Sequence, residues 1–117
     1  MRIQPLMLAL AVLGLAGCAN DPAPNEQLRL SEQALEQAKA VGANEQVPEF
    51  KLAEDKLVRA KSNMLGESHR DARMRAEQAE LDARLAEARV LNQKSEEQLQ
   101  AMQSRIKRLR KQLEVQP

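Results

Sequence analysis

The feature that most constrains the fold is a long stretch, from Glu67 to Gln116, that contains neither glycine nor proline. Those two residues are the ones that most often interrupt helices, and the stretch is rich in Ala, Glu, Gln, Leu, Lys and Arg, which favour them. Ser68 precedes Asp71 by three residues, an acidic version of the capping box that favours a helix start. The sequence therefore predicts one helix of roughly 45 residues, about 65–70 Å long at 1.5 Å per residue.

Seam residues recur along this predicted helix at spacings that alternate between four and three. Such spacing defines a heptad repeat and is typical of a coiled coil. The a and d positions of the repeat are Leu81, Leu85, Ala88, Asn92, Ser95, Leu99, Met102, Ile106, Leu109 and Leu113.

A second stripe of small residues follows the first half of the same stretch. It consists of Ala72, Ala76, Ala79, Ala83, Ala86 and Val90. Small side chains allow neighbouring helices to approach closely, so two stripes on one helix predict two packing surfaces in this half.

Two shorter helices are predicted before the long one. The first runs from about Asn25, a suitable N-cap residue, to Val41, with Gly42 as its stop. The second begins at Pro48, which suits a first helical turn, and ends at Gly66. Its apolar residues are spaced three and four apart and comprise Phe50, Ala53, Leu57, Ala60 and Met64.

The predicted fold class is all-α. The second helix, folded back on the third, reaches only to about Ala86, and the first helix can cover the same zone. We therefore expect a short antiparallel three-helix bundle over residues 25–91 and a long C-terminal helix of coiled-coil character. Residues 92–117 project from this bundle as an amphipathic helix with a basic tail.

The apolar stripe of the projecting helix is the predicted partner-binding surface. Its large members are Leu99, Met102, Ile106, Leu109 and Leu113. A parallel homodimer would place like charges opposite one another at three flanking pairs: Glu77–Asp82, Arg84–Arg89 and Arg105–Arg110. An antiparallel pairing, a higher homo-oligomer or an envelope protein partner is therefore favoured over a parallel zipper.

Basic residues are concentrated near the end of the chain. They are Arg105, Lys107, Arg108, Arg110 and Lys111. This basic patch could bind an anionic surface, or its charges could simply complement the negative end of a helix dipole. Nucleic acid is not an expected partner, because Phe50 is the sole aromatic residue and base stacking needs more.

Residues 1–17 are typical of a signal peptide. Arg2 supplies positive charge, and the apolar run Leu6–Leu15 is roughly half as long as a membrane-spanning helix. The run ends in Leu15-Ala16-Gly17-Cys18, which resembles the lipobox of bacterial lipoproteins. The resemblance implies lipidation of Cys18 through its thiol and a lipid anchor in a membrane. The alternative is an ordinary secretory signal followed by a chance cysteine.

Residues 18–24 are expected to form the lipidated N-terminus and an extended tether, because Pro22 and Pro24 oppose an early helix start. In Gram-negative lipoproteins an aspartate directly after the cysteine favours retention in the inner membrane. Here Ala19 occupies that place. This favours the cell outer membrane, with the chain facing the periplasm, over the inner membrane.

The sequence contains no pattern of catalytic or metal-binding residues. His69 is the single histidine and Cys18 the single cysteine, whereas a structural metal site needs about four ligands. There is no glycine-rich phosphate loop and no serine nucleophile motif. We therefore expect no enzyme activity, no cofactor, no metal and no small-molecule substrate.

Residues 49–91 resemble a family of short Gram-negative lipoproteins with an alanine-rich helical-hairpin domain of unknown function. The resemblance is carried by Leu52-Ala-Glu-Asp-Lys-Leu57, the break at Gly66, and the segment from Asp71 to Ala83. Such proteins are often encoded near OmpA-like envelope proteins, which implies a role in the cell envelope.

These features together predict a cell-envelope lipoprotein with a structural or adaptor role. Its C-terminal helix would bind another envelope component or a second copy of itself. The alternatives are a regulatory or ligand-sequestering periplasmic lipoprotein and a chaperone-like helical prong.

Overall fold

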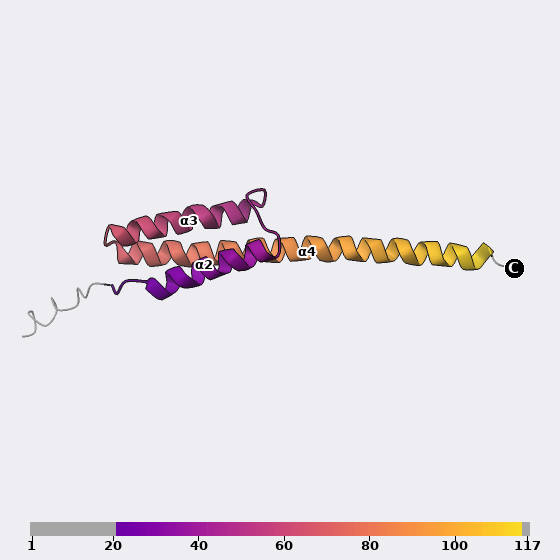
Figure 1. Cartoon of the computed structure of the whole chain (residues 1–117), viewed down its shortest axis with the longest axis horizontal. Helices are drawn as coiled ribbons and strands as arrows, with labels where there is room; N and C mark the ends of the chain where they lie inside the picture. The colour runs from indigo at the N-terminus through magenta and orange to yellow at the C-terminus, as the bar shows by residue number, and fades with distance from the viewer. Residues whose placement is uncertain (1–20, 116–117) are drawn as a thin grey trace, which may run out of the picture.

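The computed structural model describes residues 21–115, which form three helices (Figure 1). Helix α2 spans Asn25–Ala40, α3 spans Pro48–Leu65 and α4 spans His69–Val115. The predicted fold class is confirmed: the described chain is all-α, with a long C-terminal helix that extends well beyond the other two.

Helix α4 is the common support on which α2 and α3 pack (Figure 1). Two ion pairs, Arg89–Glu49 and Lys56–Asp82, show that α3 runs antiparallel to α4. Helix α2 runs in the same direction as α4, because Asp21 lies beside His69 and Val41 lies beside Lys94. The chain therefore runs up, down and up again through the bundle.

The core is narrow because alanine supplies most of it. The fully buried residues of α4 are Ala72, Ala76, Ala79, Ala83 and Ala86. Three larger residues complete the core, Leu35 from α2 and Phe50 and Leu57 from α3. Phe50 is only 2% exposed, and it is therefore the largest side chain that the bundle encloses. Small residues on α4 let both neighbouring helices lie close to its backbone.

The turn after α2 follows the Schellman pattern that the glycine predicted. The N–H of Ala43 donates to the carbonyl of Ala38 at 2.9 Å, and the N–H of Gly42 donates to the carbonyl of Lys39 at 2.9 Å. Gly42 has φ +105°, a conformation that a side chain disfavours. Ala38 and Ala43 are both buried, so the same turn also closes this end of the core.

The turn after α3 has the same pattern of hydrogen bonds, and the helix ends at Leu65 with Gly66 directly after it, as predicted. The N–H of Ser68 donates to the carbonyl of Asn63, and the N–H of Glu67 donates to that of Met64. Glu67 has φ +59°, whereas Gly66 is an ordinary C-cap with φ −84°. A non-glycine residue thus occupies the strained position, and the glycine beside it is not needed for its backbone freedom.

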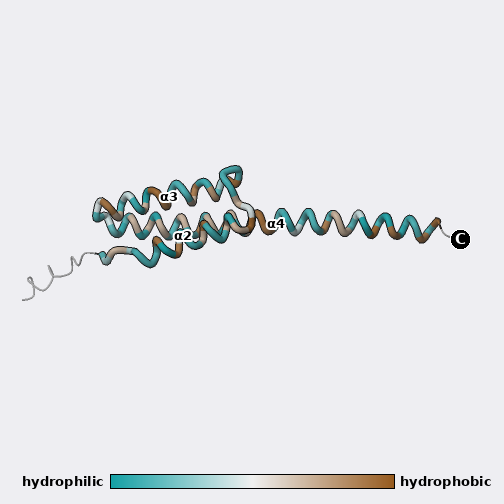
Figure 2. The backbone as a smooth tube through the Cα atoms, in the orientation of Figure 1, coloured by the Kyte–Doolittle hydropathy of each residue, from teal (hydrophilic) through white to brown (hydrophobic). Residues whose placement is uncertain are grey.

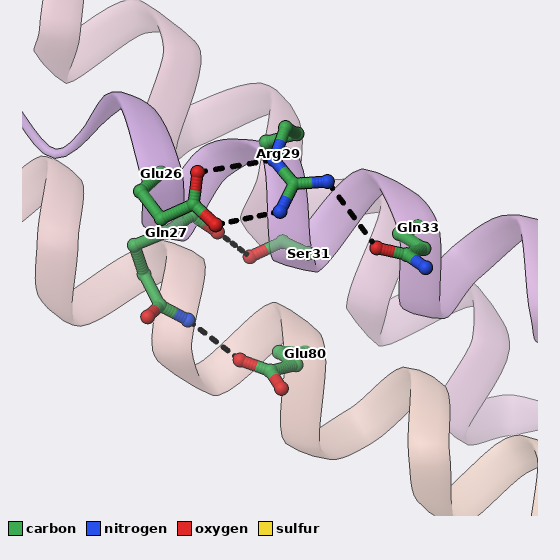
Figure 3. Close-up of polar contacts among 6 residues, drawn as sticks. All are labelled: Glu26, Gln27, Arg29, Ser31, Gln33 and Glu80. Atoms are coloured by element: carbon green, nitrogen blue, oxygen red, sulfur yellow. Dashed lines mark hydrogen bonds and ion pairs between the residues drawn. The ribbon is translucent and has the colours of Figure 1, made fainter.

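Polar groups join the first turns of α2 to α4 (Figure 3). The buried hydroxyl of Ser31 lies 2.7 Å from the carbonyl oxygens of both Gln27 and Ala76, and it can donate its one proton to either. Gln27 Nε2 donates to Glu80 Oε2 at 2.6 Å.

The prediction that Asn25 caps the first helix is wrong. Asn25 is the first residue of α2, and Pro24 takes the N-cap place without a side-chain hydrogen bond.

Candidate functional site

The two stripes predicted for the long helix lie on nearly opposite faces of α4. The alanine stripe occupies heptad positions b and f, and the leucine seam occupies a and d. At 3.6 residues per turn the centres of these stripes are about 150° apart. The alanine stripe faces α2 and α3, and all five of its alanines are fully buried. The seam therefore faces away from the bundle.

The seam is exposed even where α4 belongs to the bundle. Leu81 is 66% exposed, Leu85 is 53% exposed, and Met74 is also open to solvent. The expectation of two packing surfaces in the bundle half of α4 is therefore wrong, because only the alanine stripe packs against other helices. Because alanine side chains leave room for close approach, α2 and α3 both fit against one face of α4 and neither reaches the other face.

The seam continues without a break along the projecting part of α4. All residues from Leu91 to Val115 are exposed, and Figure 2 shows short hydrophobic bands recurring along this part of the helix. The exposed fraction of the predicted partner-binding residues ranges from 49% at Ile106 to 73% at Leu113. Leu99, Met102 and Leu109 fall between these values. We call the exposed a and d positions from Leu81 to Leu113 the outer seam.

The predicted basic patch does not form one face. Arg105 and Arg110 occupy g and e positions and border the outer seam, whereas Lys107, Arg108 and Lys111 lie on the other side of the helix. All five are exposed, and none forms an ion pair within residues 21–115. The structure thus spreads positive charge around the end of α4 rather than along one stripe.

Four charged residues in the bundle half of α4 form ion pairs within the chain. Lys56 of α3 reaches Asp82 at 2.5 Å, and Glu49 reaches Arg89 at 2.9 Å. Arg84 pairs with Glu80 one turn earlier at 2.6 Å. The two pairs with α3 fix its register on α4, and none of these ion pairs involves a residue of the outer seam.

Cys18, the predicted lipidation site, lies outside the described residues. His69 Nδ1 lies 2.8 Å from the carbonyl oxygen of Asp21, which gives it a structural contact at the entry to the bundle. Within residues 21–115 no three His, Cys, Asp or Glu side chains are grouped to hold a metal ion. None of the described helices is both long enough and apolar enough to cross a bilayer.

Comparison with known proteins identifies the domain. A family model described as a domain of unknown function, DUF4398, matches residues 26–102, which is more than half of the chain. This chain belongs to the DUF4398 family. The resemblance described above rests on residues 49–91, and the DUF4398 match extends further, to α2 and to the first turns of the projecting helix.

The DUF4398 fold is also known from a crystal structure. A DUF4398 family protein (PA2901) from Pseudomonas aeruginosa PAO1 is 63% identical and superposes with a TM-score of 0.77. The matched region covers 79% of this chain and 96% of the other. No curated protein matches this chain.

Proposed function

We propose that this DUF4398 protein is a cell-envelope lipoprotein with a structural or adaptor role, and that it docks through the outer seam of α4. The observation that carries the proposal is the exposure of the seam over both halves of the helix, from Leu81 to Leu113. Large apolar side chains that are exposed together, as Leu99 to Leu113 are on the projecting helix, mark an interaction site more often than isolated exposed leucines do.

Energetics support a bound state for this surface. Complete burial of one Leu, Ile or Met side chain contributes roughly 1.5–3 kcal/mol. The five large seam residues of the projecting helix are between 49% and 73% exposed, so a partner could bury the part of each side chain that now contacts solvent. The helix that carries them is already formed, so docking requires little ordering of the backbone.

The membrane part of the proposal rests on residues 1–24. The segment Leu15-Ala16-Gly17-Cys18 supports lipidation at Cys18, and Ala19 supports sorting to the outer membrane with the domain in the periplasm. Metabolic labelling with palmitate should label the native protein and not Cys18→Ser. Fractionation of the native protein should place it with outer-membrane markers; recovery in the soluble periplasmic fraction would contradict the anchor.

The adaptor role is tested by capture of partners from envelope membranes solubilised in mild detergent. We would compare the native chain with a chain that ends at Glu97 and with the full-length variant Ile106→Glu. Glu97 is a suitable end because Lys94 Nζ donates to the carbonyl of Val41 at 2.5 Å and should be kept. Gln100→Glu adds the same charge on the face away from the seam and is the matched control.

The expected result is capture of a specific envelope component by the native chain and by Gln100→Glu, with loss in the other two. If all four chains retain the same proteins, the outer seam is not the working surface. A ligand-sequestering role would then gain support, because such a role needs no projecting helix.

A further inference from the structure

We infer that the partner of the outer seam is a second copy of this chain, bound antiparallel, so that the projecting helix of each copy lies along the bundle of the other. The inference rests on the proposed role of the seam and names its occupant. It follows from three properties of α4: the order of residues along the seam, the distribution of charge, and the area that the seam offers.

The order of seam residues fits an antiparallel pair. In such a pair an a residue of one helix shares a layer with a d residue of the other. With the midpoint of the seam at residue 97, the two outer layers pair Leu81 with Leu113 and Leu85 with Leu109. The inner layers then combine small or polar residues with large apolar ones: Ala88 with Ile106, Asn92 with Met102, and Ser95 with Leu99.

A parallel pair would match the same residues badly. Each seam residue would face its own copy, so the consecutive layers at Ala88, Asn92 and Ser95 would contain no large apolar side chain. Small residues facing small residues leave gaps, and the dispersion contacts of those layers are lost. The like-charged flanking pairs, such as Arg105–Arg110, add repulsion to this poor packing.

Charge distribution favours the antiparallel direction as well. Residues 18–91 carry 11 Lys and Arg against 14 Asp and Glu, whereas residues 92–117 carry six against three. Antiparallel pairing separates the two basic tails and lays each one along residues 69–91 of the other copy, where five Arg are balanced by five Asp and Glu. Parallel pairing would bring the two basic tails together, and Arg105 and Arg110 already lack ion-pair partners in the part of the chain that the structure describes.

The available area is sufficient for a specific interface. The seam from Leu81 to Leu113 is about 50 Å long, and a helix with its side chains is about 10–12 Å wide, which gives roughly 550 Å² for each copy. The total of about 1,100 Å² exceeds the ~1,000 Å² expected of a specific interface. Helices α2 and α3 lie on the other side of α4 and leave this strip open along its whole length.

Thiol crosslinking tests the direction of pairing. The chain from Ala19 to Pro117 keeps every described residue and has no cysteine, so cysteines can be introduced singly. Leu85→Cys and Leu109→Cys share a layer only in the antiparallel pair. A short bis-maleimide should therefore give abundant covalent dimer in a mixture of the two variants and little with either variant alone. Abundant dimer from each variant alone would show parallel pairing and overturn the inference.

Sedimentation equilibrium of the same soluble chain tests the stoichiometry. We expect a dimer whose dissociation constant rises at least tenfold in Ile106→Glu and changes little in Gln100→Glu, with circular dichroism showing equal helix content. A monomer at every concentration, or a higher oligomer, would overturn the inference. Seam-dependent capture of a different envelope component by a monomeric chain would leave the proposed adaptor role standing and remove only the second copy.

Discussion

Ala83 and Leu85 are two residues apart on α4 and lie in opposite environments: Ala83 is fully buried in the core with α2 and α3, and Leu85 is 53% exposed. Two residues correspond to a rotation of about 200° around the helix. The relationship repeats along the bundle half of α4, where small residues hold the fold and large ones face outward. This reverses the usual assignment of leucine to the core, and it allows the two faces to be tested separately.

Enlarging one of the buried alanines of α4 should destabilise the bundle. Ala83→Leu adds volume where α2 and α3 approach α4 closely, so we expect the free energy of unfolding to fall by about 1–3 kcal/mol. Ala101→Leu makes the same change at an exposed position of the same helix. Urea unfolding followed by circular dichroism should show little change for this control. Equal loss in both variants would show that the cost arises from the helix itself and not from packing.

The two interhelical turns should respond in opposite ways to alanine. Gly42→Ala places a side chain at φ +105° and should lower the free energy of unfolding by about 1 kcal/mol. Gly66→Ala should raise it by about 0.4–1 kcal/mol, since φ is −84° and a Cβ there meets only ordinary contacts of 3.6 and 3.7 Å. Thermal unfolding of both variants would measure this difference in sign.

Glu67→Gly is expected to stabilise the chain, because the native glutamate holds a left-handed conformation at φ +59°. Relief of that strain should outweigh the added freedom of the unfolded chain and give a gain of a few tenths of a kcal/mol, up to about 1 kcal/mol. A loss of stability would mean that the glutamate side chain contributes an interaction greater than the strain.

The ion pair between Lys56 and Asp82 should be more strongly coupled than the pair between Lys61 and Glu32. The side chains of Lys56 and Asp82 are only 27% and 20% exposed, and Lys56 Nζ lies 2.5 Å from Asp82 Oδ2. A double-mutant cycle with Lys56→Gln and Asp82→Asn should give a coupling of about 1 kcal/mol. The Lys61–Glu32 pair, about half exposed on both sides, is the reference and should give less. Equal coupling in the two cycles would show that partial burial does not strengthen the first pair.

Glu26 should titrate below its usual range. The hydrogen bond from Arg29 lowers the pKa of the Glu26 carboxyl and raises that of the Arg29 guanidinium (Figure 3). Since the folded pKa of Glu26 lies below the unfolded one, the contribution of this pair is present above the unfolded pKa and is lost as pH falls through the folded pKa. In carboxyl ¹³C NMR titrations Arg29→Gln should raise the pKa of Glu26. An unchanged titration would show that the pair is not formed in solution.

The long helix and its two stripes could be predicted because their signals are local. The absence of glycine and proline between Glu67 and Gln116 and the regular spacing of leucines are properties of one segment. Which of the two stripes of α4 is buried in the bundle could not be predicted in the same way. Periodicity identifies stripes, but whether Ala83 or Leu85 packs against α2 and α3 depends on how closely the three helices approach one another.

Two local details were also beyond the sequence. Ser31 can be buried because its hydroxyl can donate to the carbonyl of Gln27 or of Ala76. Only the packing of α2 on α4 brings the carbonyl of Ala76 within reach. Glu67 takes the left-handed position because the hydrogen bonds of the turn run to Asn63 and Met64. Gly66 precedes it with φ −84°, so the glycine of this turn does not mark its left-handed residue.

The contact between His69 and the Asp21 carbonyl means that the chain enters the bundle at the end where α4 begins. The far tip of the 47-residue helix therefore lies about 70 Å from the point of entry. In an antiparallel pair the two entry points would stand at opposite ends of one rod, about 85 Å apart at 1.5 Å per residue. If both copies carry the proposed lipid anchor in the outer membrane, such a rod would lie along that bilayer as a girder held at its two ends.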